Sequence, residues 1–145
     1  MMRVINTTAP WLVVGFFVVP PWLASIEPAE NWLAVSGITV GDSDAGSPIL
    51  MTVNRVIHRP FIANWVATVR RVVGDGVEVT CTATSTASYR PDAVLPRPVT
   101  LDWWTYPIQC VLPPGRYRLD TVWRIDAGGG VTKLVTAESN IFTIR

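Results

Sequence analysis

Beyond residue 32 the chain is a succession of short apolar stretches separated by turns, and this rhythm constrains the fold more than any other feature. The stretches are rich in Val, Ile, Thr and aromatic residues, and Gly and Pro recur between them. Such stretches are typical of β-strands, and no window after residue 35 keeps a helical period. The sequence therefore predicts an all-β body with residues 85–98 as a loop. The expected strands are residues 33–40, 49–57, 61–73, 77–84, 99–105, 117–125, 131–136 and 141–144. Alternation along residues 117–125 predicts that Tyr117, Leu119, Thr121, Trp123 and Ile125 point inward.

A Gly-Asp-Gly sequence at residues 74–76 predicts a β-hairpin between two of these strands. If these three residues form the loop, Val73 lies opposite Val77 and Val69 lies opposite Cys81. One face of the hairpin then points into the core and the other points to solvent. The inward side chains in this register are Trp65, Ala67, Val69, Val79, Cys81 and Ala83.

The segment LPPGRY at residues 112–117 resembles the tyrosine corner of immunoglobulin-like and fibronectin-III-like β-sandwiches. The positions that match are Leu112, Pro114, Gly115 and Tyr117. The resemblance implies that the tyrosine hydroxyl hydrogen-bonds back to the chain a few residues upstream. It also implies an Ig-like antiparallel β-sandwich of about seven strands over residues 31–145. Because this fold hosts many unrelated roles, the resemblance says little about function.

The cysteines depart from the antibody-type pattern, in which a Cys lies two residues after the corner tyrosine. Here that position is Leu119, and the two cysteines are Cys81 and Cys110. In an exported domain they can form a disulfide, and closing a loop of about 30 residues would add roughly 3 kcal/mol of stability. The alternative is that Cys81, on an inward face, is a small buried apolar residue.

The N-terminal region, residues 1–30, contains no charge between Arg3 and Glu27 and is mostly apolar from residue 9 to residue 26. We expect a hydrophobic helix there that contacts the lipid bilayer through residues 8–26. The positive charge before it and the acidic residues after it favour a cytoplasmic N-terminus. The expected location is therefore the inner membrane, as a single-pass protein whose sandwich domain is periplasmic or extracellular.

Pro20 and Pro21 leave two further interpretations of this region open. Proline ends or kinks a helix, and residues 9–19 alone span about 16 Å against a hydrocarbon core of about 30 Å. That length suits a cleaved signal peptide, although Trp22 and Leu23 occupy positions where cleavage prefers small residues. A buried core segment is the third interpretation. We favour a retained anchor with a kink.

Charge and catalytic side chains argue against two classes of function. A formal net charge of +1 does not favour nucleic-acid binding, which normally needs a basic surface. His58 is the sole histidine and follows an expected strand. The GDS sequence that includes Ser43 superficially resembles a hydrolase motif, but Arg55 stands where that class needs an Asp before its histidine. We expect neither an enzyme nor catalytic residues.

The same turn also spells a partial calcium-loop pattern, with Asp42, Asp44 and Gly46 at alternate positions. The full pattern needs Gly at its sixth position and Glu at its twelfth, where this chain has Ser47 and Val53. A turn stabilised by Asp side chains is the simpler interpretation. We therefore predict no metal site and no cofactor.

An aromatic cluster at residues 101–107, LDWWTYP, is the best candidate for a binding surface. On the expected strand, neighbouring tryptophans point to opposite faces, so one would be core and the other exposed. An exposed patch of this kind can stack on sugar rings or anchor a protein partner. The alternative is that the Pro-rich loop covers the second tryptophan. The candidate binding residues are Trp103, Trp104, Tyr106 and, from the loop, Tyr89.

These features predict a non-enzymatic, membrane-anchored Ig-like module for binding or assembly, with an unknown protein or glycan as its partner. Eleven of the twelve basic residues are Arg, which is typical of GC-rich bacterial or phage genomes. The alternative is a structural subunit of a phage particle or envelope assembly, whose apolar N-terminus packs against other subunits.

Overall fold

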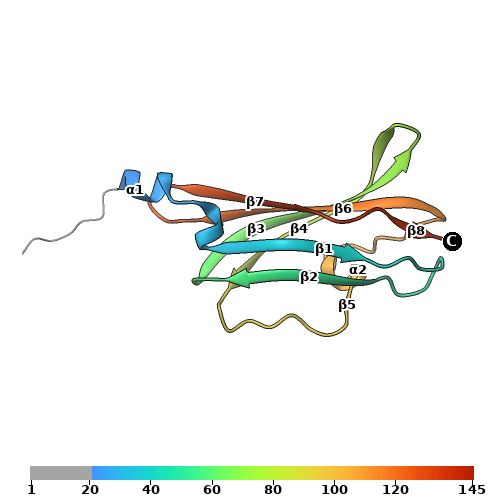
Figure 1. Cartoon of the computed structure of the whole chain (residues 1–145), viewed down its shortest axis with the longest axis horizontal. Helices are drawn as coiled ribbons and strands as arrows, with labels where there is room; N and C mark the ends of the chain where they lie inside the picture. The colour runs from blue at the N-terminus through green and yellow to red at the C-terminus, as the bar shows by residue number, and fades with distance from the viewer. Residues whose placement is uncertain (1–20) are drawn as a thin grey trace, which may run out of the picture.

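The computed structural model describes residues 21–145, which form eight strands in two sheets (Figure 1). One sheet has the order β1-β2-β5; the other has the order β4-β3-β6-β7, with β8 also pairing with β6. Every pair of neighbouring strands is antiparallel. The all-β prediction is confirmed. The strands are β1 Leu33–Val40, β2 Leu50–Ile57, β3 Phe61–Val73, β4 Gly76–Tyr89, β5 Val99–Thr100, β6 Gly115–Asp126, β7 Thr132–Glu138 and β8 Phe142–Ile144; the helices are α1 Pro21–Ile26, η1 Ala29–Asn31 and α2 Leu101–Trp104.

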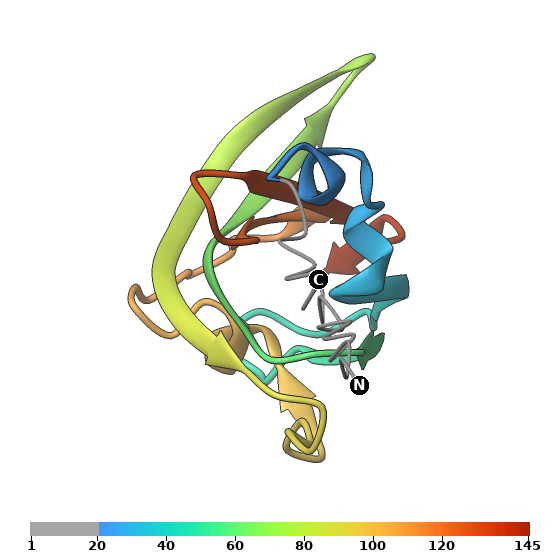
Figure 2. The ribbon, with the colours of Figure 1, turned by 90° about the vertical axis from the view of Figure 1, so that its left-hand side faces the viewer.

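The core lies between the two sheets, which Figure 2 shows as separate layers. Strand β6 shows how the sequence builds it, because alternate side chains of a strand point to the same face. The side chains predicted to point inward from β6 are all buried. They are Tyr117, Leu119, Thr121, Trp123 and Ile125.

The β3–β4 hairpin has the predicted partners near its base but a different tip. Val69 pairs with Cys81 as expected, whereas Val73 pairs with Gly76 rather than with Val77. Gly74 has φ of 57°, so it suits the first central position of a two-residue type II′ turn. A register shift after Val69 then adds one residue to β4, a β-bulge.

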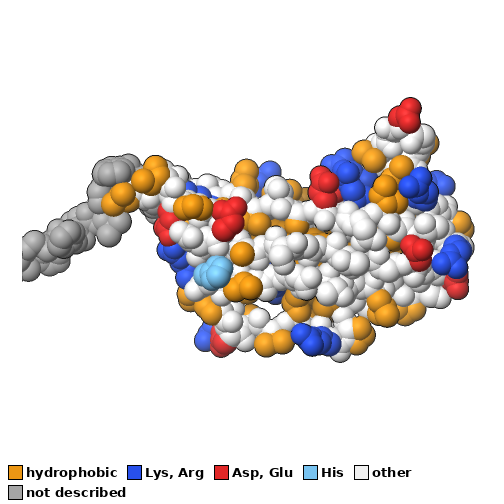
Figure 3. All heavy atoms as spheres, viewed as in Figure 1, with side chains coloured by type: hydrophobic (Ala, Val, Ile, Leu, Met, Phe, Trp, Pro, Cys, Tyr) orange, Lys and Arg blue, Asp and Glu red, His pale blue; other side chains and the backbone are white. Residues whose placement is uncertain are grey.

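This bulge overturns the prediction that Val79 points inward. Val79 is 57% exposed, because the bulge pairs it with Arg70, on the face opposite the buried Val69. Beyond it, the tip of the hairpin extends past the last residue pair between β3 and β6, Arg71 with Tyr117. The tip therefore protrudes from the sandwich (Figure 1), and charged side chains surround its base (Figure 3).

Two predicted boundaries between residues 85 and 105 are wrong. Strand β4 continues to Tyr89, so residues 85–89 are strand rather than loop. The expected strand at 99–105 is only two residues long and gives way to helix α2. The Thr100 hydroxyl caps this helix by accepting a hydrogen bond from the Trp103 amide at 3.3 Å, which stabilises a first helical turn.

The Tyr117 hydroxyl donates a hydrogen bond of 2.6 Å to the carbonyl oxygen of Pro113. The tyrosine is fully buried, with its ring centroid 6.0 Å from that of Phe142. Gly115 lies close to the side chains of Arg71 and Tyr117. A Cβ atom at this position would be 3.0 Å from Nε of Arg71 and 3.4 Å from the Tyr117 ring. A larger residue at 115 would therefore displace the buried tyrosine or Arg71.

Replacing Tyr117 by Phe is expected to lower the free energy of unfolding by about 1 kcal/mol, the usual net value of one hydrogen bond. Urea unfolding followed by far-UV circular dichroism measures the change. Tyr106→Phe is the matched control, because its hydroxyl bonds to Ser85 at 2.9 Å on the exposed surface. An equal loss in both variants would contradict a special role for the buried bond.

The two sheets are joined along one side by polar bonds between β1 and the end of β7. The Asn140 side chain accepts from the Val40 amide at 2.8 Å and donates to the Val40 carbonyl at 2.9 Å. Ile38 and Ser139 add an isolated bridge nearby. On the opposite side, β5 is too short to meet β4, and this side is where the molecule is hollowed.

The chain that enters the sandwich is fixed to it by Glu27 and Arg59. The Glu27 carboxylate accepts from Asn31 at 3.0 Å and forms an ion pair with Arg59. These hydrogen bonds, that of Asn31 first, lower the pKa of Glu27. Arg59 also lies over the ring of Trp32, 4.1 Å from its centroid. These contacts hold the segment between α1 and β1 against the sandwich.

The predicted hydrophobic helix and the bilayer contact of residues 8–26 lie largely outside the described residues. Within residues 21–145, no helix combines the length and the apolar character needed to cross a bilayer.

Candidate functional site

The four aromatic residues predicted for binding line one cavity of about 230 Å³. The cavity opens on the side where the two sheets are not joined, and it receives side chains from β2, β3, β4, β6 and α2. Its lining is Arg55, Trp65, Ala87, Ser88, Tyr89, Ala93, Trp103, Trp104, Tyr106, Thr121 and Trp123. We refer to it as the aromatic cavity.

Trp104 forms the inner wall of this cavity. It is 6% exposed, and its indole Nε1 donates to the Thr121 hydroxyl at 3.1 Å. Its ring meets the ring of Trp123 edge-on, with centroids 6.1 Å apart. Thr121 is fully buried in β6, so this hydrogen bond satisfies two polar groups in the core. Trp104 therefore ties α2 to the second sheet.

Trp103 lies at the rim of the cavity and is 46% exposed. The prediction that one of the two adjacent tryptophans is core and the other exposed is confirmed, but its reason is wrong. The pair lies on a helix rather than a strand, and successive side chains there diverge by about 100°. The Thr100 cap sets the start of α2 and so decides which tryptophan turns inward.

Tyr106 and Tyr89 both line the cavity but differ in exposure. Tyr106 is 62% exposed and its ring centroid is 5.8 Å from that of Trp65. Tyr89 belongs to the end of β4 rather than to the loop, and it is buried with its ring stacked on Phe61 at 4.8 Å. Burial raises the pKa of the Tyr89 hydroxyl, so this group stays neutral at physiological pH.

Arg55 is the residue that sequence reasoning missed. It occupies an inward position of β2, in the same row as the buried Met51, Val53 and Ile57. Its guanidinium carbon lies 5.5 Å from the centroid of the Tyr89 ring, and it has no ion pair within residues 21–145. Burial lowers its pKa, but arginine stays charged at neutral pH. The sequence did contain a signal for this residue, because Arg55 is the one charged residue among the alternating apolar positions of β2 that face inward.

The cavity thus combines flat aromatic faces with one half-buried cation. A cation over an aromatic face is stabilised in part by the ring, and an anion supplied from outside would stabilise it further. None of the lining residues is His, Cys, Asp or Glu. The arrangement suits the binding of a flat or apolar group that carries a negative charge.

The other candidates from the sequence lie elsewhere and serve local structure. The Ser43 hydroxyl donates weakly to the carbonyls of Asp44 and Pro48, at 3.4 and 3.3 Å. The Asp42 carboxylate accepts from the Thr143 amide at 2.7 Å, so it links the turn to β8 rather than to the backbone of the turn itself. In the part of the chain that the structure describes, no cluster of metal-ligating side chains occurs.

Cys81 and Cys110 form a disulfide, with their Cα atoms 6.0 Å apart. Cys81 lies on β4 and Cys110 lies in the segment between α2 and β6. The bond therefore attaches the chain that follows α2 to the second sheet. Together with the Thr100 cap it fixes both ends of the segment that carries Trp103, Trp104 and Tyr106.

Fold and site together define an all-β protein of two antiparallel sheets with an aromatic cavity at its open side. No protein family, curated protein or solved structure matches this chain significantly.

Proposed function

We propose that this chain is a non-enzymatic, membrane-anchored binding module of the Ig-like or fibronectin-III-like class, and that the aromatic cavity is its ligand site. The observation that carries the proposal is the convergence of four aromatic residues from β4 and the α2 segment on one opening. They stand beside Arg55, a half-buried cation without a carboxylate partner in residues 21–145.

The strand order supports the Ig-like class. In Ig-like sandwiches the third, penultimate and last main strands are neighbours, in the order C-F-G, and the first two pair with strand E in the other sheet. Here β3-β6-β7 and β1-β2-β5 follow the same two orders, and β4 lies where strand C′ of variable domains lies. The hydrogen bond from Tyr117 to the Pro113 carbonyl agrees with a tyrosine corner.

The disulfide argues against the antibody branch of that class. Antibody domains join strands B and F across the core, with a Trp of strand C against the bond. This chain has a buried tryptophan on β3, Trp65, but its disulfide joins β4 to the segment before β6. The proposal is therefore a general Ig-like sandwich rather than an antibody-type domain.

Trp103 and Tyr106 support a binding role because they are exposed together at one cavity that is lined by further aromatic residues. Each exposes about half or more of its surface, while Trp104 and Trp123 form a rigid wall behind them. Aromatic residues of this kind are enriched at protein interfaces and stack on sugar rings. A protein or glycan partner fits such a surface.

The proposed location is the inner membrane, with the anchor in residues 1–30 and the sandwich in the periplasm or outside the cell. The disulfide supports an oxidising compartment, because such bonds persist mainly in exported domains. Fixation of Glu27 and Trp32 by Arg59 would hold the sandwich close to the bilayer surface.

The alternative is a structural subunit of a phage particle or envelope assembly. The protruding hairpin favours it, since Val73, Val77 and Val79 are each 45% exposed or more near its tip. Fractionation separates the two proposals. A full chain that pellets with membranes and resists alkaline carbonate supports the anchor and excludes packing of the N-terminus against subunits.

Titration of the full chain with candidate ligands tests the binding site. We expect that a ligand from a panel of soluble oligosaccharides and peptides shifts the fluorine NMR signals of Trp103 and Trp104 in protein labelled with 5-fluorotryptophan. The Trp32 signal is the internal control, because this residue follows η1 and lies outside the cavity. Trp103→Ala should weaken the binding. If neither class of ligand moves these signals, the proposed site is wrong.

A further inference from the structure

Strand β2 has a free edge beside the aromatic cavity. Strand β1 pairs with β2 along its length, from Ile57 to Met51. On the other side β5 covers only Leu50 and Met51. Residues 52–57 of β2 therefore have a strand neighbour on one side only.

The backbone groups that point to this free edge can be identified by alternation along the strand. The Ile49 carbonyl accepts from the Leu101 amide on the β5 side, whereas the Leu50 carbonyl accepts from the Gly41 amide on the β1 side. Because neighbouring residues of a strand direct their N–H and C=O groups to opposite sides, odd-numbered residues of β2 point away from β1.

Val53 and Arg55 consequently present N–H and C=O groups that bond to no other part of residues 21–145. Strand β5 does not cover them, because residues 95–98, which would continue it, are not part of a strand. The chain bows away from β2 instead, as the loop of residues 90–98 (Figure 1).

The space between the β2 edge and this loop is a groove of about 920 Å³. That size is within the usual range of ligand clefts, about 300–1,000 Å³. The groove adjoins the aromatic cavity, because Arg55 and Ala93 line both. The β2 edge thus forms one side of the groove, and the shared residues Arg55 and Ala93 lie where it meets the aromatic cavity.

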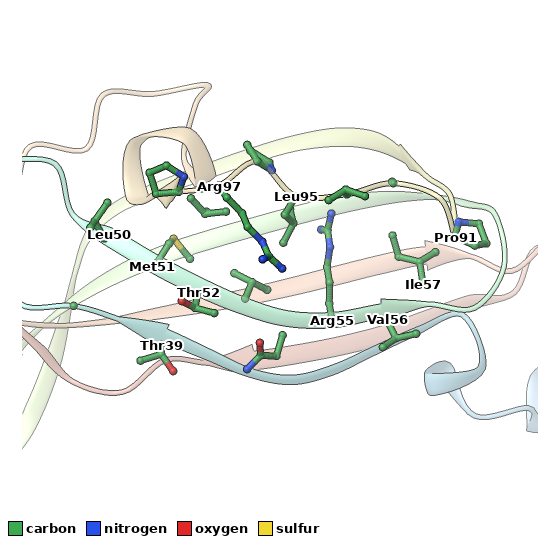
Figure 4. Close-up of a pocket in the computed structure, with 18 residues that line it drawn as sticks. Thr39, Leu50, Met51, Thr52, Arg55, Val56, Ile57, Pro91, Leu95 and Arg97 are labelled. Carbon is green, nitrogen blue, oxygen red and sulfur yellow. The ribbon is translucent and has the colours of Figure 1, made fainter.

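The groove is positively charged. Figure 4 shows Arg55 extending from β2 and Arg97 from the loop into the same space. No acidic residue is among those that line the groove, and the nearby Asp92 forms an ion pair with Arg90 at 3.1 Å. Arg55 and Arg97 have no carboxylate partner among residues 21–145. They favour an acidic occupant, since opposite charges fix the register of binding.

Building on the proposed binding function, we propose that β2 adds an extended acidic peptide of a partner protein as a further strand. The peptide continues the line of β5, antiparallel to β2, and forms main-chain hydrogen bonds with Val53 and Arg55. An acidic side chain opposite Arg55 forms the charge-assisted bond that this guanidinium lacks. Apolar side chains two residues away on the same face point toward the aromatic cavity.

Labelled heptapeptides test this inference against the full chain in phosphatidylcholine nanodiscs, with fluorescence anisotropy as the readout. The peptides carry Glu at the centre, Val, Leu or Phe two positions to each side, and Thr elsewhere. We expect at least one to bind. Gln in place of the central Glu should weaken binding by about tenfold, the loss expected for a charge-assisted hydrogen bond.

Variants of the protein locate the site. Arg55→Gln should weaken the Glu peptide by about tenfold and remove the preference for Glu over Gln, because the two changes break one interaction. Arg97→Gln, on the exposed loop, provides a second test with no risk to the core. Arg124→Gln is the control, because that arginine lies exposed on β6 outside the groove and should bind like the wild type.

N-methylation of the peptide tests the added strand itself. Methyl groups on the amides of the Glu and its two apolar neighbours remove the bonds to β2 and should abolish binding. Methyl groups on the Thr amides between them should have a smaller effect, because these amides point away from β2.

The inference is overturned if no peptide binds, if Arg55→Gln leaves the Glu preference intact, or if N-methylation at the facing amides has no effect. Self-association through β2 or binding only to anionic lipid vesicles would also overturn it. If oligosaccharides still shift the Trp103 signal while every peptide fails, the proposed function stands and only the peptide inference is wrong. If both fail, both are wrong.

Discussion

Replacing Trp104 by Ala is expected to lower the free energy of unfolding by about 3–5 kcal/mol, the usual range for a large aromatic residue removed from a core. Trp104 is 6% exposed, meets Trp123 edge-on and donates to Thr121. The substitution empties the inner wall of the aromatic cavity. It also leaves the buried Thr121 hydroxyl without its donor, which adds to the cost.

Trp103→Ala is the matched control, because it removes the same side chain one residue earlier on the same helix. It should cost less than about 1 kcal/mol, as is usual for a side chain that is half exposed. Urea unfolding followed by far-UV circular dichroism compares the two without relying on tryptophan fluorescence. Similar losses in both variants would show that Trp103 is also a packing residue and would remove the case for a binding surface there.

The opposite fates of these two tryptophans show what the sequence could predict about the fold. Alternation correctly placed Tyr117 and Trp123 inside, because β6 lies in the middle of its sheet with partners on both sides. It failed at the segment that begins with Val99, where the Thr100 cap and the end of β5 replace strand by helix. A run of two strand residues is too short for periodicity to mark its end.

The β3–β4 hairpin was also predicted only in part. The Gly-Asp-Gly sequence correctly predicted a turn, and the partner of Val69 was correct. The β-bulge that exposes Val79 was not predictable, because the alternation of Val77, Val79, Cys81 and Ala83 continues across the extra residue without a break. Tertiary contacts decide where such a residue is accommodated.

For the candidate site, residue types were easier to predict than their arrangement. Trp103 and Tyr106 attracted attention as aromatic residues close together in sequence, and they do line one cavity with Tyr89. The contribution of Arg55 depends on pairing between strands far apart in the chain and on the early end of β5. Edge positions of this kind follow from topology, which one sequence does not specify.

Loss of the disulfide is expected to have the second large effect. Replacing both Cys81 and Cys110 by Ala should lower the free energy of unfolding by about 3–4 kcal/mol, the value expected when a cross-link closes a loop of about 30 residues. The corresponding fall in melting temperature is on the order of 10 °C for a domain of this size. Thermal unfolding of the full chain, followed by far-UV circular dichroism, measures it.

Reduction of the wild type by dithiothreitol is the control, because it breaks the same bond without replacing either cysteine. It should lower the melting temperature of the wild type by a similar amount and leave the double variant unchanged. Intact mass before and after reduction reports whether two hydrogen atoms are gained. An unchanged mass and melting temperature would mean that the cysteines are not bonded, and the argument for an oxidising compartment would lose its support.

Because Trp104 is also held by α2 and Thr121, we expect the reduced protein to keep its buried indole while Tyr106 becomes more exposed. The disulfide would then contribute to the shape of the cavity opening as well as to stability.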